Sequence, residues 1–429
     1  MASAEEAPKG ERTPLLASGS SKQKLAFIEG LRFVAVGWIV VYHYAAWTDS
    51  SVPEAVKRLI TNFPLDLFTV VSGFVTHLAY ANKDTSGGTL QFLGGRVQKL
   101  VLIYYLSSLL CLGIKLTNHA VEEKEDGGGG HGSKRLVNDL IAFVPDIFGI
   151  NAWFSATSLL PVGAGGAVVS YLAETTMPTN APLWYVQALA FCWVLYPTFK
   201  GLVKEHCAEQ MGRVAVIAVC MWLLSMLPLC VYAVYPGGSQ FQFLKVFPPF
   251  LVPSFLVGAL ACELHLQSQA LSASSRPAVL SSQYAAIAAE LLFVGYCVVV
   301  ALVPLNGDLA LHLWTLFWAG MLLLFSAAVA ATEGYDGEAE QIQCGLKWVL
   351  DSEFLGLLGG VSLYVYALQR PLSILCHWCV DMTAGEPGWV HVQWMDWYIF
   401  VPFFILLQAI AWLVMQVEPK WSTGKKTSD

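Results

Sequence analysis

The chain has 429 residues, of which 56% are hydrophobic and only 13% are charged. Soluble domains usually carry about 25% charged residues, and a mean hydropathy of +0.56 over this length is too high for a soluble globule. The shortage of charge also excludes an intrinsically disordered chain and a nucleic-acid-binding surface. The composition therefore predicts an all-α, polytopic transmembrane helical bundle, because helices satisfy their own backbone hydrogen bonds in lipid.

The first 24 residues are polar and lack the apolar region of a signal peptide, so we expect residues 1–24 to form a disordered cytosolic tail. This tail contains Glu11-Arg12-Thr13-Pro14-Leu15-Leu16, which resembles the acidic dileucine signal that sorts membrane proteins to lysosomes or vacuoles. An endolysosomal or vacuolar membrane is therefore one expected location. The plasma membrane or another endomembrane is the alternative, because so short a pattern also arises by chance.

Ten apolar stretches are long enough to cross a bilayer, which takes about 20 residues. They cover residues 25–47, 60–81, 97–115, 182–203, 212–235, 243–264, 283–304, 309–332, 353–376 and 395–417. Residues 25–417 are thus predicted to form one transmembrane domain, and residues 418–429 a second cytosolic tail.

The segment 116–181 interrupts this series. Four consecutive glycines and many polar residues predict a flexible outer loop at about 116–135. The next part, 136–160, is apolar but is broken by Asp139, Pro145, Asp146 and Asn151. We interpret it as an interfacial or re-entrant segment. If it crosses the membrane instead, the orientation of every later span is reversed.

Lys and Arg residues indicate the orientation. With the N-terminus inside, 15 of the 24 fall in inner segments, 7 fall in outer segments, and Arg32 and Arg370 lie within spans. Positively charged residues concentrate on the cytosolic side of membrane proteins. Both termini are therefore expected to be cytosolic.

The first span carries two ionisable side chains, Arg32 and His43, on one face. The 11-residue separation amounts to about three helical turns, or roughly 16 Å along the axis. Arg32 would lie near the cytosolic side, paired with Glu29 one turn earlier, and His43 in the outer half. Such groups inside a membrane are functional candidates, although a single His can also serve only as a hydrogen bond between helices.

The second span repeats the spacing with Asp66 and His77, and Gly73 on the same face permits close approach of another helix. We expect Asp66 at the depth of His43, where a carboxylate beside an imidazole would orient a general base. The alternative is that Asp66 only caps the start of its helix.

Three further positions are polar at informative places. Arg96 and Lys99 lie one turn apart at the inner edge, either as a charge anchor or as a clamp for a cytosolic polyphosphate ligand. Arg370, between Gln369 and a helix-bending Pro371, needs a partner inside the membrane.

The remaining features have structural readings. Trp184 opens the fourth span, as an aromatic-belt residue would. Cys376 and Cys379 form the closest cysteine pair, but no second pair completes a four-ligand site. We therefore expect no metal and interpret this pair as packing, with a short disulfide as the alternative.

Five strings occur in order along the chain. They are Phe27–Val36 leading to His43, Asp66–Phe74 including Ser72, Arg96–Lys99, Leu183–Val186, and Gly359–Pro371. They resemble the motifs of the acyltransferase-3 family of integral membrane acyltransferases. Those motifs are an Arg and a His separated by ten residues, an acidic residue followed by aromatics and Ser-Gly-aromatic, Arg-x-x-Arg, a tryptophan motif, and Gly-x-x-Ser…Tyr…Pro. The order and spacing hold from about residue 26 to residue 376.

The resemblance implies an enzyme that takes an acyl group, usually acetyl, from acyl-CoA at the cytosolic face. It would deliver the group to a hydroxyl on the outer or luminal face, commonly of a small or lipid-linked carbohydrate. His43 would act as general base or transient acyl carrier, oriented by Asp66. Acyl-CoA, the co-substrate, would be bound by Arg32, Arg96 and Lys99. The acceptor cavity would involve Ser72, Trp184, Gln369 and Arg370.

Four positions depart from the family pattern. Lys99 stands where a second Arg is usual, Leu102 where Pro is common, Leu189 where many members have Glu, and Gln369 where many have His. These departures leave open an inactive acyltransferase-like protein. A secondary transporter that uses the same charges as a substrate path is the other alternative, although no repeat supports it.

Overall fold

The computed structural model describes residues 25–47, 64–83, 89–125, 131–154, 179–234, 243–271, 284–303, 311–333, 345–384 and 397–417, with a few single positions between them. Within these ranges all regular secondary structure is helical, which confirms the all-α prediction. Both expected tails lie outside the described residues, and so does the dileucine string Glu11–Leu16 in the first of them.

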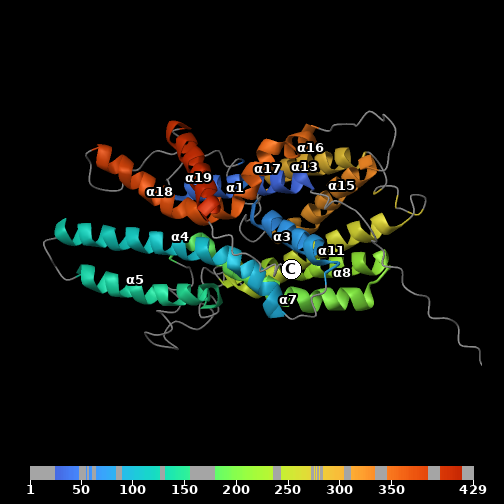
Figure 1. Ribbon diagram of the computed structural model, residues 1–429, viewed down its shortest axis with the longest axis horizontal. Coiled ribbons are helices and arrows are strands. Elements are labelled where there is room, and N and C mark those ends of the chain that lie inside the picture. Colours follow the sequence, from blue (N-terminus) through green and yellow to red (C-terminus); the bar gives the residue numbers. More distant parts are fainter. Residues whose placement is uncertain are drawn as a thin grey trace, which may run out of the picture.

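Most helices run along the long axis of the molecule (Figure 1). The longer ones are α1 (Ala26–Trp47), α3 (Pro64–Tyr80), α4 (Thr89–Glu125), α5 (His131–Phe148), α7 (Trp184–His206), α8 (Met211–Ser225), α11 (Val252–Ala270), α13 (Ala285–Leu302), α15 (Thr315–Glu333), α18 (Ser362–Ala384) and α19 (Trp397–Val417). Short elements connect them: α9 (Leu227–Val234), α16 (Gly345–Leu350), α17 (Glu353–Gly360), and the 3-10 turns η2 (Ala181–Leu183), η3 (Pro248–Leu251) and η5 (Leu311–Trp314).

Seven helical stretches in the described ranges are long and apolar enough to cross a membrane. They are Ala26–Tyr44, Phe92–Thr117, Ala181–His206, Met211–Val234, Pro248–Ala270, Ala285–Leu302 and Phe400–Val417. Two shorter apolar helices, Leu65–Tyr80 and Thr315–Val329, fall on the expected spans 60–81 and 309–332. The expected span 353–376 is divided, because α17 ends at Gly360 and α18, which carries Pro371, begins at Ser362.

The centre of the bundle is the contact between α3 and α11. A methyl group on Gly73 would lie 1.9 Å from the carbonyl oxygen of Phe255, and one on Gly258 would lie 2.0 Å from that of Val70. Small residues let helices in lipid approach until their backbones touch. The close approach that we predicted at Gly73 therefore occurs, and α11 is the partner helix.

Substituting Gly73 with Ala is expected to destabilise the protein by about 1–3 kcal/mol, because the added methyl group overlaps a backbone carbonyl that cannot rotate away. Thermal unfolding of the detergent-solubilised protein measures the effect. Gly113→Ala on α4 is the matched control, since nothing lies within 4 Å of that methyl position. An equal melting temperature for both variants would contradict the proposed packing.

The α4–α5 hairpin differs from the sequence expectation. We predicted a loop at 116–135, but α4 continues to Glu125 and α5 begins at His131. The reason is local, because the Glu and Lys residues that follow Val121 favour helix and the glycine run at 127–130 ends it. α5 then returns beside α4, where the hydroxyl of Tyr105 donates to the carbonyl of Ile147 over 2.5 Å.

The interpretation of 136–160 as an interfacial or re-entrant segment stays a prediction. Figure 1 shows α4, α5 and α18 reaching the same end of the molecule. α5 is not among the described helices that are long and apolar enough to span a membrane. It ends at Phe148 and is followed by Gly149, which has a φ of 64°. Left-handed glycine is the usual way for a helix to stop and reverse.

Candidate functional site

His43 meets Gln369, which lies 326 residues later in the sequence, where α1 ends against α18. The Nδ1 atom of His43 is 3.1 Å from Oε1 of Gln369. The side-chain Nε2 of Gln369 donates to the carbonyl oxygen of Tyr366 over 3.0 Å, and Gln369 is fully buried. A carbonyl oxygen can only accept, so the amide group must turn its nitrogen toward Tyr366 and its oxygen toward His43.

This orientation fixes the tautomer of the imidazole. An amide oxygen accepts, so Nδ1 of His43 carries the proton and Nε2 carries the lone pair. A neutral His in this tautomer is a base with a defined basic atom. We call His43, Gln369 and Tyr366 the His43 site.

Two cationic residues, Lys245 and Arg370, contribute positive charge to the surroundings of His43. Lys245 precedes η3, and Arg370 follows Gln369 on α18. Cationic groups placed in a site of low polarity stabilise negative charge that develops on a reacting oxygen. The His43 site therefore combines a base with two candidate electrophilic groups.

An aromatic cluster lies beside the His43 site. The ring of Tyr366 is 5.8 Å from that of Tyr185 and 6.3 Å from that of Phe68, and its hydroxyl donates to the carbonyl of Pro182 over 2.5 Å. Trp184 is buried with its ring 6.1 Å from that of Tyr185. The second-span string, the tryptophan string and the late string therefore meet at one place.

Asp66 does not contact His43, contrary to the expectation from depth. Its carboxylate accepts a hydrogen bond of 2.7 Å from Thr315, whose hydroxyl is 3.0 Å from that of Ser254. Asp66 is 3% exposed and joins α3 to α15 and α11. Helical spacing alone could not give the direction of the side chain around α3. Ser72 donates to the carbonyl of Phe68 over 2.7 Å.

The opposite end of the bundle gathers cations. Arg32 is paired with Glu29 at 2.9 Å, as predicted, and the charges of Arg32 and Arg96 act on each other. The guanidinium carbon of Arg96 lies 5.1 Å from the ring centre of Tyr80 and 5.2 Å from that of Trp193. Aromatic faces hold a guanidinium by cation–π attraction. We call this group the Arg96 end; the side chain of Lys99 lies outside the described residues.

His77 is paired at this end with a residue that sequence analysis did not single out. Its Nε2 is 2.7 Å from a carboxylate oxygen of Glu263, and its Nδ1 is 3.1 Å from the hydroxyl of Tyr196. Gln267 donates to the other oxygen of Glu263 over 2.8 Å. The group ties α3, α7 and α11 together.

A third polar group surrounds Gln187 on α7. Its amide nitrogen donates to the hydroxyl of Tyr104 over 2.8 Å and to Oδ1 of Asn151 over 3.2 Å, and its oxygen accepts from the backbone N–H of Ala152 over 3.0 Å. Nearby, the backbone N–H of Thr179 donates to Oδ2 of Asp146 over 2.7 Å. These hydrogen bonds hold the end of α5 against α4 and α7.

Asp146 lies in α5, outside the spanning helices, and is 1% exposed. Burial raises the pKa of its carboxyl group to about 6, while the hydrogen bonds from Thr179 oppose the shift.

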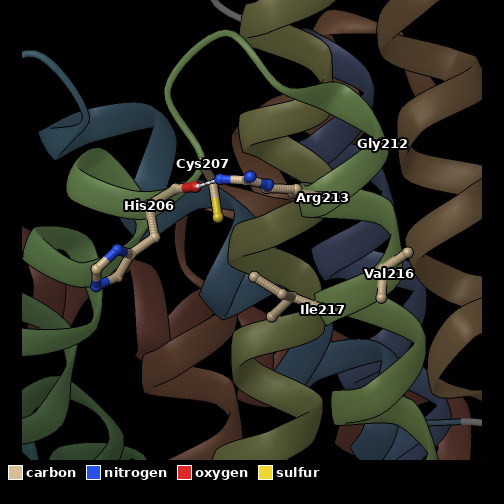
Figure 2. A pocket seen from close by; sticks show the side chains of 6 residues that line it. All are labelled: His206, Cys207, Gly212, Arg213, Val216 and Ile217. Carbon is tan, nitrogen blue, oxygen red and sulfur yellow. Dashed lines mark hydrogen bonds between the residues drawn. The ribbon is translucent and has the colours of Figure 1, made fainter.

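A cavity of about 360 Å³ lies elsewhere, at the turn from α7 to α8 (Figure 2). It is lined by His206, Cys207, Gly212, Arg213, Val216 and Ile217. The guanidinium of Arg213 donates to the carbonyl of His206 over 3.3 Å. None of these residues belongs to the His43 site or to the Arg96 end, so the cavity carries none of the chemistry above.

Among the described residues, no group of three or more His, Cys, Asp or Glu side chains could hold a metal ion. Cys376 and Cys379 are both free thiols.

The structure thus brings together His43 with Gln369, and Arg32 with Glu29. It separates Asp66 from His43. Sequence analysis missed Lys245, Gln187 and Glu263 as site residues, because each is isolated in an ordinary apolar or polar stretch and no local spacing marks it.

Comparisons with known proteins give a family and nothing closer. A family model described as an acyltransferase domain, that of the acyltransferase-3 family, matches residues 25–416. No curated protein and no solved structure matches the chain. The match covers nearly the whole length and all five strings, so the chain belongs to the acyltransferase-3 family of membrane acyltransferases.

Proposed function

We propose that this protein transfers an acyl group, specifically acetyl, from cytosolic acyl-CoA to a hydroxyl of a carbohydrate or lipid-linked acceptor on the luminal or outer face. The observation that carries the proposal is the bond between His43 and Gln369, which gives the imidazole a defined basic nitrogen.

The reaction uses the His43 site as follows. Nε2 of His43 takes the proton of the acceptor hydroxyl while its oxygen attacks the thioester carbonyl carbon. Lys245 and Arg370 stabilise the oxyanion that forms. The intermediate then collapses, the carbon–sulfur bond breaks, and His43 gives its proton to the leaving thiolate. In the alternative, Nε2 of His43 itself attacks the thioester carbon and expels the CoA thiolate. The acceptor hydroxyl then attacks the acyl-imidazole, which releases His43, and the hydroxyl proton passes to the thiolate.

The Arg96 end supports binding of the donor. Arg32 and Arg96 place two positive charges at the end of the bundle that the Lys and Arg distribution assigns to the cytosol. Phosphate groups of CoA are the natural counterparts of such a pair, since a guanidinium binds phosphate through two parallel hydrogen bonds.

Replacing Arg96 with Ala is expected to raise the KM for acetyl-CoA about 10- to 100-fold, the effect of losing hydrogen bonds to a charged group. Arg96→Lys should recover little of it, because Lys lacks the planar fork that lies on the aromatic rings. Initial rates at varied acetyl-CoA give the constant. Arg213→Ala, which removes an exposed Arg of α8, is the control and should change KM less than twofold; an unchanged KM in the Arg96 variants would reject the assignment.

The proposal as a whole is tested with purified protein, radiolabelled acetyl-CoA and glycans or glycolipids from the host membrane. Labelled ester product that depends on the protein supports it. Substrate flux across sealed vesicles without acetyl-CoA would favour a transporter instead. Absence of both activities would indicate an inactive member of the family.

Location is a separate proposal. We propose cytosolic termini and an endolysosomal or vacuolar membrane, on the strength of the charge distribution and of Leu15-Leu16. Changing both leucines to Ala should move a fluorescent fusion protein to the cell surface, and an unchanged distribution would reject the sorting signal.

A further inference from the structure

Two buried oxygen atoms near the His43 site are hydrogen-bond acceptors that lack a donor. They are Oδ1 of Asp146 and Oδ1 of Asn180, and neither has a hydrogen-bond partner among the described residues. Asp146 is 1% exposed and Asn180 is fully buried. A buried polar atom without a partner costs about 1–3 kcal/mol, so each position calls for an explanation.

Both side chains are held by their other atoms. Oδ2 of Asp146 accepts from the backbone N–H of Thr179 over 2.7 Å, and Nδ2 of Asn180 donates to the carbonyl of Ala367 over 2.7 Å. Rotation of either group would break one of these bonds. The two oxygens are therefore fixed in place. Their residues are neighbours, because Asp146 binds the backbone of Thr179 and Asn180 is the next residue.

The pair is joined to the His43 site through α18. The carbonyl of Ala367, which accepts from Asn180, lies two residues before Gln369 on α18. One residue earlier, the hydroxyl of Tyr366 donates to the carbonyl of Pro182 in η2 over 2.5 Å. Asn180 is also the residue directly before η2.

The chemistry of the pair selects its ligand. One amide oxygen and one carboxylate oxygen can only accept, so the ligand must supply hydrogen-bond donors. Phosphates and carboxylates are excluded, because they bring further acceptors and negative charge. A compound with several hydroxyl groups fits.

We propose that Asp146 and Asn180 bind hydroxyl groups of a polyhydroxylated acceptor, adjacent to the hydroxyl that His43 deprotonates. This inference rests on the proposed function and names the residues that recognise the sugar.

The test compares two acceptors that share an alkyl chain, octyl β-glucoside and 1-octanol, with acetyl-CoA as donor and the protein in a detergent without a sugar head group. Asp146→Asn keeps an oxygen for Thr179 and turns the second position from acceptor to donor. We expect kcat/KM for octyl β-glucoside to fall about 10- to 100-fold, with less than a twofold change for 1-octanol. Ser326→Ala on α15, whose hydroxyl is equally buried without a partner, is the matched control and should change neither value.

A second measurement needs no substitution. The wild-type protein is assayed with the mono-deoxy derivatives of octyl β-glucoside. For one derivative, the kcat/KM of the wild type should be lower by a similar factor. The kcat/KM of Asp146→Asn for that derivative should not be lower than that of the wild type. Equal losses on glucoside and octanol, or full activity on every deoxy derivative, would overturn the inference while the proposed function stands. Failure of the wild type to release CoA from acetyl-CoA with any acceptor would instead remove the proposed function itself.

Discussion

His43→Ala is expected to lower acetyl transfer by about 10²–10⁴-fold, the usual contribution of a positioned general base. The variant should remain folded and inserted, because His43 is only half-buried and lies near the end of α1. The measurement is the initial rate of labelled ester formation at saturating acetyl-CoA, with the elution profile of the detergent-solubilised protein as the test of folding.

A second histidine within the bundle provides the control. His265 on α11 is 2% exposed, with its ring 6.3 Å from that of Phe74. His265→Gln removes a buried imidazole far along the chain from the His43 site and should retain at least half of the activity. Normal turnover by His43→Ala would exclude His43 from the chemistry, and equal losses in both variants would indicate a structural effect.

Gln369→Leu is expected to lower kcat roughly 100-fold while leaving the KM for acetyl-CoA unchanged. Leu has the same bulk but no acceptor, so Nδ1 of His43 loses the bond that selects the tautomer, and losing such an orienting partner is costly in histidine-based catalysis. Gln369→His should retain most of the activity, because an imidazole can accept from His43 with one nitrogen and donate to Tyr366 with the other.

Gln408→Leu is the matched control for Gln369. Gln408 on α19 is 8% exposed, and neither atom of its amide has a hydrogen-bond partner among the described residues. Its loss should not affect transfer. If Gln369→Leu and Gln369→His lose activity equally, the residue fills space and does not orient His43.

The sequence was sufficient to predict the class of protein and contacts within a single helix. Charge content and apolar stretches predict helices in a membrane, and the helical repeat places Arg32 one turn from Glu29, as observed at 2.9 Å. It also marked Gly73 as a contact point. These features are local, because they depend on residues within a few turns of one helix.

Helical spacing did not predict which residue of another helix a side chain would contact. Asp66 was expected beside His43, but its partner is Thr315, which lies 249 residues away. The loop expected at 116–135 is mostly helix, because local helix propensity and packing against α5 outweigh the polar composition.

Membrane insertion, the helix-forming stretches and the family motifs follow from the sequence alone, since each depends on composition or on spacing within a single segment. Only the tertiary structure decided that Gln369 is hydrogen-bonded to His43, that Asp66 is bonded to Thr315, and that Asn180 is bonded to the backbone of α18. The physical reason is that helix rotation and pairing are set by side-chain packing between segments hundreds of residues apart, and no local period records which faces will meet.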